Sequence, residues 1–163
     1  MAVNIRRASP QDGRRLYGEW QQMRQHNATH DARIVLAPVS ENEFSAGLAE
    51  SLARPGVTTI IAEEGERIVG FVSATVTAST PDRLPDRHVS IGYIFVDPSR
   101  RRGGVARLLI DAVREWAAEQ DGVQHLEMPV LAADGEAASF WRAVGFTPFI
   151  ERLWAPLDSG GKT

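Results

Sequence analysis

The sequence of 163 residues contains no cysteine. This absence excludes disulfide bonds, thiolate metal sites and a cysteine nucleophile, so an acyl group could not be stored on a thiol of the chain. No apolar run approaches the length of a membrane span. The first residues, 1–7, lack the apolar core of a signal peptide. We therefore expect a cytoplasmic protein without a membrane partner.

The net charge is small, and lysine is rare. The formal net charge is −3, which argues against general binding of polyanions, and we expect no nucleic-acid partner. Lys162 is the single lysine among 18 basic residues, so arginine carries nearly all positive charge. The length suits one domain with a real core. We predict one domain over residues 1–157 and a disordered tail over residues 158–163.

One stretch combines a strand, a basic turn and a helix. Ile91–Val96 is apolar and rich in residues that favour strands. Asp97 and Pro98 end it, because proline has no N–H for a ladder. A helix is predicted downstream by apolar residues that recur on one face. These residues are Val105, Leu108, Leu109, Ala112, Val113 and Trp116.

The turn between this strand and this helix has the chemistry of an anion site. The first N–H groups of a helix have no partner within the helix and lie at its positive end. Gly103 and Gly104 lack a Cβ, so a ligand oxygen could approach their backbone closely. Ala106 keeps the first turn small, and residues 100–102 are all arginine. A phosphate or pyrophosphate is the expected ligand.

The sequence Arg101-Arg102-Gly103-Gly104-Val105-Ala106 also fits the pattern R/Q-x-x-G-x-G/A. It resembles the acyl-CoA pyrophosphate loop of the GNAT superfamily of N-acetyltransferases. Residues 64–72 resemble the second hairpin of that family, and residues 134–146 resemble its last helix. No G-x-G-x-x-G occurs, which disfavours a dinucleotide-binding fold.

The predicted element order is also that of the family. It implies an α/β (α+β) fold, with one GNAT-like domain whose mixed sheet of six to seven strands is flanked by about four helices. Strands are predicted at residues 3–7, 57–62, 67–76, 88–96 and 125–130, with one or two closing strands in 146–157. Helices are predicted from Ser9 to about Gln25, from Ser40 to about Leu52, from Val105 to about Gln120 and from Asp134 to about Val144.

The resemblance implies acetyl-CoA, or a close acyl-CoA, as co-substrate and no metal. In this family the pantetheine arm enters a gap beside the central strand, and a backbone N–H there polarises the thioester carbonyl. The residues implied for CoA binding are Phe95, Val96, Arg101, Arg102, Gly103, Gly104, Val105, Ala106, Asp134 and Trp141. Ile94 and Val96 are the candidates for the polarising N–H.

Two positions depart from the family pattern. Asp134 stands where the family usually has asparagine, and we favour a helix N-cap as its role. Trp141 stands where the family usually has a tyrosine that protonates the departing thiolate. An indole N–H is no acid near neutral pH, so we expect Trp141 to pack against the core or the pantetheine arm.

A general base is harder to assign from the sequence. Candidates are Glu63, His88, Tyr93 and Glu127, each of which could also be an ordinary solvated residue. Of these we retain Tyr93 and Glu127 as catalytic candidates beside Ile94 and Val96.

The stretch from His26 to His30 has i, i+4 spacing, which could bind metal on a helix. Because the stretch follows the predicted helix end, we interpret it as a polar loop. In the family this loop borders the acceptor pocket, so the candidates for acceptor contacts are Trp20, His26, His30 and Arg33.

The predicted function is direct transfer of an acyl group from acetyl-CoA to an amine, which is a small molecule or a peptide. The alternative is a non-catalytic acyl-CoA-binding sensor or partner module of the same fold. A third hypothesis is a protein that binds a phosphate ligand other than CoA. The sequence also leaves open whether the protein forms a homodimer.

Overall fold

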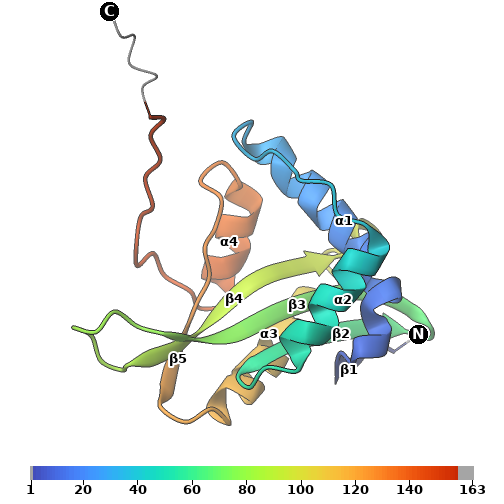
Figure 1. The fold of residues 1–163 in the computed structure, drawn as a ribbon, viewed down its shortest axis with the longest axis horizontal. Helices are drawn as coiled ribbons and strands as arrows, with labels where there is room; N and C mark the ends of the chain where they lie inside the picture. Colours follow the sequence, from blue (N-terminus) through green and yellow to red (C-terminus); the bar gives the residue numbers. More distant parts are fainter. Residues whose placement is uncertain (1, 158–163) are drawn as a thin grey trace, which may run out of the picture.

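A five-stranded mixed sheet forms the middle layer of the molecule, which the computed structural model describes over residues 2–157 (Figure 1). The strands are β1 (Asn4–Arg7), β2 (Val57–Glu64), β3 (Arg67–Ala78), β4 (Arg87–Val96) and β5 (Val123–Glu127), and they lie in that order. β1 to β4 pair antiparallel, whereas β4 and β5 pair parallel. The helices are α1 (Gly13–His30), α2 (Glu41–Leu52), α3 (Val105–Ala118) and α4 (Gly135–Ala143), with short 3-10 turns at Pro10–Asp12 and Pro98–Arg100.

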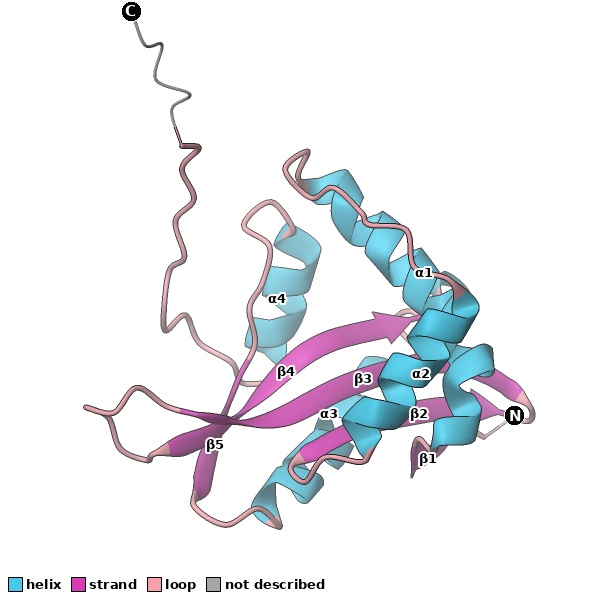
Figure 2. Cartoon of the chain, in the orientation of Figure 1, coloured by secondary structure: helices cyan, strands magenta, loops and turns pink. Residues whose placement is uncertain are grey.

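The two faces of the sheet are covered by different helices (Figures 1 and 2). On one face, Leu16 and Met23 of α1 pack with Phe71 and Phe95, and α2 adds partly buried residues to that cluster. On the other face, α3 packs against the alternate side chains of the same strands, and Trp141 of α4 belongs to that second cluster. This alternation follows from the period of two along a strand.

The predicted helix starts at Ser40 and Asp134 are confirmed by their caps, whereas the start predicted at Ser9 is a 3-10 turn and α1 begins at Gly13. At α2, Ser40 Oγ accepts a hydrogen bond from Glu43 N at 3.2 Å, and the Glu43 carboxylate accepts one from Ser40 N at 2.7 Å, which is a capping box. At α4, Asp134 Oδ1 accepts a hydrogen bond from Ala137 N at 2.9 Å, as an N-cap does.

The prediction of six to seven strands is wrong, because the described residues form five. Residues 147–157 are not helical and form no strand, and none of their backbone groups bonds to β5 within the part of the chain that the structure describes. A strand needs a partner for its N–H and C=O groups, so apolar composition alone did not make one here. The large apolar side chains of this segment are exposed: Phe149, Ile150, Leu153, Trp154 and Leu157. The tail predicted at 158–163 lies outside the described residues.

Across residues 2–157, none of the helices has the length and apolar character that crossing a bilayer would require.

Candidate functional site

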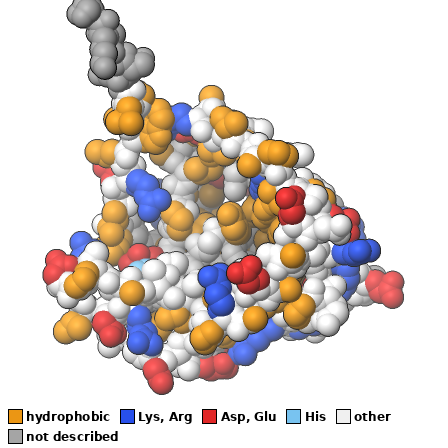
Figure 3. Space-filling view, in the orientation of Figure 1, with side chains coloured by type: hydrophobic (Ala, Val, Ile, Leu, Met, Phe, Trp, Pro, Cys, Tyr) orange, Lys and Arg blue, Asp and Glu red, His pale blue; other side chains and the backbone are white. Residues whose placement is uncertain are grey.

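The end of β4 is an open edge of the sheet. β5 pairs with β4 from Arg87 to Ser90, where Ser90 lies opposite Glu127, the last residue of β5. β4 continues to Val96 with β3 on one side and no paired strand on the other among residues 2–157. The gap beside β4 that the family resemblance implied is therefore present. Figure 3 shows that the surface is hollowed here, between α4 and α1.

A bulge in β4 marks the start of the open edge. Ser73 pairs with Tyr93 and Ala74 pairs with Ile91, so Gly92 is the extra residue. A Cβ on Gly92 would lie 3.0 Å from Ser73 Oγ, and the same hydroxyl accepts a hydrogen bond from Tyr93 N at 3.0 Å. The side chain of Ser73 thus supplies the bond that a regular ladder would have made.

The direction of the N–H groups along the open edge follows from the ladder. Asp97 N donates to Val69 O at 2.9 Å, so it points toward β3. In an antiparallel pair, alternate residues direct their N–H and C=O groups to opposite sides. Phe95 therefore faces β3 as Asp97 does, and Ile94 and Val96 direct their N–H groups into the gap. These are the two residues that the sequence analysis expected to polarise a carbonyl.

The turn before α3 presents unbonded N–H groups. Asp97 opens the turn by accepting a hydrogen bond from Ser99 N at 2.8 Å. Gly104 is the N-cap residue of α3 and has φ of +81°, a left-handed conformation that favours glycine. Among the described residues no acceptor bonds the N–H groups of residues 104–107. Together they form the positive end of α3, where an anion is stabilised.

The three arginines of this turn have different roles. Arg100 donates two hydrogen bonds to Glu64, at 2.8 and 2.7 Å, and these hold the pKa of the Glu64 carboxyl below its usual range. Arg101 and Arg102 are exposed, and neither forms an ion pair within residues 2–157. Their charge is thus available to a ligand, whereas the charge of Arg100 is already paired.

Trp141 lies in the core rather than at the surface. It is 4% exposed and makes edge contacts with Phe140 and Phe146, whose ring centroids lie 5.2 and 4.9 Å away. Arg114 of α3 donates a hydrogen bond to Val144 O at the end of α4. Packing is therefore a sufficient structural reason for the indole.

Glu127 lies where the pairing of β4 with β5 ends, beside the imidazoles of His88 and His125. Its carboxylate contacts His125 Nε2 at 3.0 Å and His88 Nε2 at 3.3 Å. His88 is buried and also contacts the hydroxyls of Ser79 and Ser90. Tyr93, by contrast, is 49% exposed directly beyond the bulge.

Glu63 is excluded as a base by its partners. It is buried beside Arg6 and Arg15, with contacts of 2.7 and 2.9 Å. The hydrogen bond from Arg6 is the main cause that lowers the pKa of Glu63. Glu63 therefore remains a carboxylate that fixes β1 and α1 to β2, far along the sheet from β5.

Glu19 was missed by the sequence analysis. It is partly buried on α1, and its position three residues after Leu16 and four before Met23 places it beside the apolar stripe. Burial raises the pKa of the Glu19 carboxyl, and the nearby charge of Asp97 raises it further. The signal that could have found it is an acidic residue within an apolar helical stripe.

The interpretation of His26–His30 as a loop is wrong. α1 continues to His30, and no glycine or proline interrupts it there. The two imidazoles lie one turn apart, and His30 Nε2 lies 3.4 Å from Asp134 Oδ2 of α4. Of the other acceptor candidates, Trp20 packs at a tilt against Phe44 with ring centroids 4.6 Å apart, and Arg33 pairs with Asp31.

Comparisons with known proteins agree with this geometry. Residues 18–146 match the family model described as the acetyltransferase (GNAT) family. Human N-acetyltransferase 8 is 27% identical over 95 residues, which are 58% of this chain and 40% of that protein. The chain thus matches well under half of the length of this curated relative.

Solved structures share the fold at low identity. The aminoglycoside N-acetyltransferase AAC(6')-Iy in complex with CoA has a TM-score of 0.78 at 20% identity, covering 96% of this chain and 95% of that chain. The aminoglycoside 6'-N-acetyltransferase AAC(6')-Ih from Acinetobacter baumannii has a TM-score of 0.72 at 17% identity, covering 98% and 100%. AAC(6')-Iy is also similar in its complex with a bisubstrate analog, CoA-S-monomethyl-acetylneamine, with a TM-score of 0.78 at 20% identity over 96% and 99%.

Proposed function

The chain belongs to the acetyltransferase (GNAT) family, and from that premise we propose that it transfers an acetyl group from acetyl-CoA directly to the amine of a small molecule. The observation that carries the proposal is the open edge of β4, followed directly by a turn in which the first N–H groups of α3 are unpaired and arginines lie beside them. A structural relative was captured with CoA and with an analog that joins CoA to an acetylneamine. These relatives support CoA as the donor and a small amine as the acceptor.

In this proposal the turn before α3 holds the pyrophosphate. The free N–H groups of residues 104–107 donate to its oxygens, and Arg101 and Arg102 add positive charge from the rim. Arg100 fixes the turn to β2 through Glu64. In this proposal Val96 borders the pantetheine arm along the open edge, and Asp134, the N-cap of α4, faces the arm from the other side. The buried side chains of Phe95 and Trp141 support these two walls from the core.

The N–H of Ile94 or Val96 polarises the thioester carbonyl and stabilises the oxyanion that forms when the amine attacks. A preorganised donor of this kind is typically worth about 10²–10³ in rate. The tetrahedral intermediate then releases the thiolate of CoA, and the amine loses its proton. No residue of the chain forms a covalent intermediate, in keeping with the absence of cysteine.

Glu127 is our proposed acceptor of that proton. Ser90, its partner in β4, precedes Ile94 by roughly 13 Å of strand, so the proton reaches Glu127 through water rather than by direct contact. His125 and His88 fix the orientation of the carboxylate. Tyr93 lies next to Ile94 and is placed to orient the amine.

The test measures donor binding and turnover separately. Acetyl-CoA at a hundredfold its dissociation constant should stabilise the fold by about 2.7 kcal/mol, a rise of roughly 5–11 °C in the melting temperature. ATP should do much less. Thiol release is then measured across a panel of small amines that includes aminosugars.

Equal stabilisation by ATP and acetyl-CoA would contradict the donor assignment. Strong stabilisation by acetyl-CoA without thiol release for any amine would instead indicate the non-catalytic binding module.

A further inference from the structure

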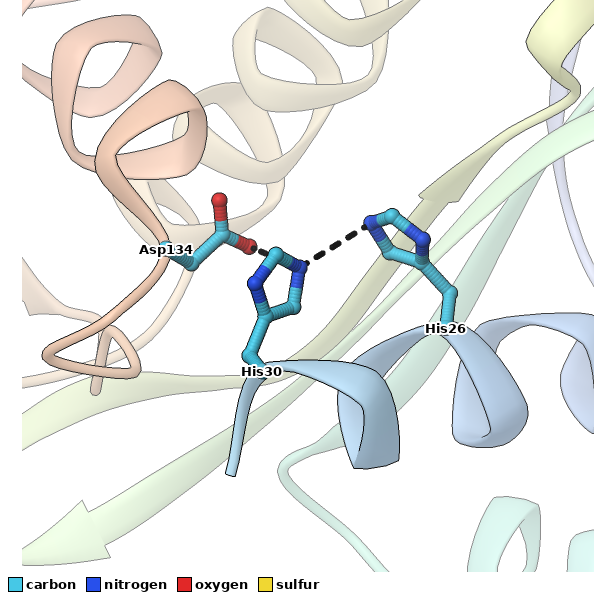
Figure 4. A group of neighbouring side chains, drawn as sticks. All are labelled: His26, His30 and Asp134. Atoms are coloured by element: carbon cyan, nitrogen blue, oxygen red, sulfur yellow. Dashed lines mark hydrogen bonds and ion pairs between the residues drawn. The ribbon is translucent and has the colours of Figure 1, made fainter. Parts of the chain in front are cut away.

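Three potential metal ligands converge where the end of α1 meets the start of α4 (Figure 4). His26 and His30 come from successive turns of α1, and Asp134 precedes the first residue of α4. His26 Nε2 and His30 Nε2 lie 3.3 Å apart, and His30 Nε2 lies 3.4 Å from Asp134 Oδ2. One ligand atom from each residue lies within 4.8 Å of the other two.

Hydrogen bonding alone leaves this arrangement unsatisfied. A ring nitrogen carries either one proton or one lone pair in its plane, so His30 Nε2 can form one linear hydrogen bond. It is nevertheless close to both His26 Nε2 and Asp134 Oδ2. A cation between the three atoms would interact with a lone pair of each.

The spacing of the atoms fits coordination. In a tetrahedral zinc site with bonds of about 2.0–2.1 Å, neighbouring ligand atoms lie about 3.3–3.4 Å apart. The two short contacts of this cluster have that length. Imidazole with carboxylate is a donor set that suits zinc and its neighbours in the first transition row rather than magnesium or calcium.

Two of the three ligand side chains are shielded from solvent, whereas His26 is exposed. The Asp134 side chain is 14% exposed and that of His30 is 23% exposed. Asp134 Oδ1 is held by Ala137 N at 2.9 Å, which orients the carboxylate and leaves Oδ2 for the cluster. The negative end of α1 and the positive end of α4 both lie here, so the net charge that favours a cation comes from the Asp134 carboxylate.

We propose that His26 Nε2, His30 Nε2 and Asp134 Oδ2 bind a divalent transition-metal ion of the zinc class. The ion ties α1, which packs on one face of the sheet, to α4, which packs on the other, across the open edge of β4. Three protein ligands leave a fourth position for water.

The chain simplifies the test, because its four histidines all lie in two clusters and it has no cysteine. The second cluster, His88 with His125 and Glu127, already places hydroxyl partners on both nitrogens of His88. Thiolate coordination cannot contribute to a spectrum of the bound metal.

The experiment titrates Co²⁺ into the full chain, without a histidine tag and after removal of metals with a chelator. The visible d–d bands of tetrahedral Co²⁺ should appear at one equivalent for this site and disappear when Zn²⁺ is added. The double variant His26→Gln/His30→Gln should lose these bands, whereas His125→Gln should keep them.

Asp134→Asn is the variant that keeps the helix cap, because asparagine is as good an N-cap as aspartate. It should weaken Co²⁺ binding at least about tenfold, the scale observed when even outer partners of metal ligands are removed. Zn²⁺ should raise the melting temperature of the wild type and not that of the double variant.

Absence of tetrahedral bands in the wild type, or their survival in the double variant, would overturn the proposal. Because these measurements need neither CoA nor turnover, they are independent of the proposed acetyl transfer.

Discussion

Trp141 provides the sharpest test of how the proposed reaction proceeds. The family usually has a tyrosine acid at this position, and here the side chain is an indole that is 4% exposed between Phe140 and Phe146. The leaving group is a thiol with a reference pKa of about 8.5, by analogy with cysteine. A thiolate can leave near neutral pH, so an acid is helpful rather than essential.

The expected cost of Trp141→Phe can be worked out from this burial. Phenyl has about three fewer ring atoms than indole, and at about 0.8 kcal/mol for each buried carbon the loss of stability is roughly 2 kcal/mol. For a chain of this length the melting temperature should fall by roughly 4–8 °C. Trp141→Ala should cost about 3–5 kcal/mol, because it leaves a cavity among α3 and α4.

Turnover should respond much less than stability. If Trp141 packs and moves no proton, Trp141→Phe should lower kcat less than about tenfold, whereas general acid help is typically worth about 10²–10⁴. Trp141→Tyr should keep the fold and supply a proton donor, so its kcat should equal or exceed that of the wild type. The assay is thiol release against pH for the three proteins, below their melting temperatures, with CoA affinity measured in parallel.

A hundredfold loss of kcat in Trp141→Phe, with CoA affinity unchanged and the protein folded, would refute this reasoning. It would show that the indole acts on the reacting atoms.

Three further predictions concern the turn before α3 and an ionic cluster in which Arg6 and Arg15 pair with Asp12 and Glu63. Gly104→Val should abolish CoA binding in a folded protein, because a branched side chain at φ of +81° is strained and faces the ligand; unchanged affinity by calorimetry would place the pyrophosphate elsewhere. Arg102→Ala should weaken CoA binding and reduce its salt dependence, whereas Arg100→Ala should mainly lower the melting temperature; the reverse pattern would contradict their assigned roles. Arg6→Met should cost about 3 kcal/mol at pH 7, the lower end for a broken buried pair, because Arg6 is 34% exposed. Arg6 holds the pKa of the Asp12 carboxyl below its ordinary value of 3.8, so the stabilisation is fully present above pH 3.8 and is lost as the pH falls below it. Urea unfolding should therefore show that the difference in free energy of unfolding between wild type and Arg6→Met is smaller at pH 3 than at pH 7. An equal difference at both pH values would contradict this assignment.

Much of the fold could be predicted because its signals are local. The box of Ser40 and Glu43, the cap at Asp134 and the apolar stripe that begins at Val105 each depend on residues within one helix and its cap. The basic turn was predicted for the same reason, since a strand, two glycines and a helix follow one another directly in the sequence.

The errors concern partners that are distant in the sequence. Residues 146–157 have the composition of a strand, but a strand also requires an edge that accepts it, and the composition does not contain that edge. The end of α1 was predicted near Gln25, although nothing in the next five residues breaks a helix. That error concealed the approach of His30 to Asp134. The open edge of β4 likewise depends on where β5 ends, and the sequence of β4 contains no signal for that position.

The two departures from the family pattern lie on one helix, and each has a positional consequence. Asp134 caps α4 and contacts His30, which connects the start of the helix to α1. Trp141 packs inside the cluster that α4 shares with α3, and Arg114 bonds to Val144 O at the end of the helix. α4 is thus held at both ends. Orientation and carbonyl polarisation by the N–H groups of β4 need no proton donor, so we expect the substitutions in α4 to change the free energy of unfolding more than the turnover.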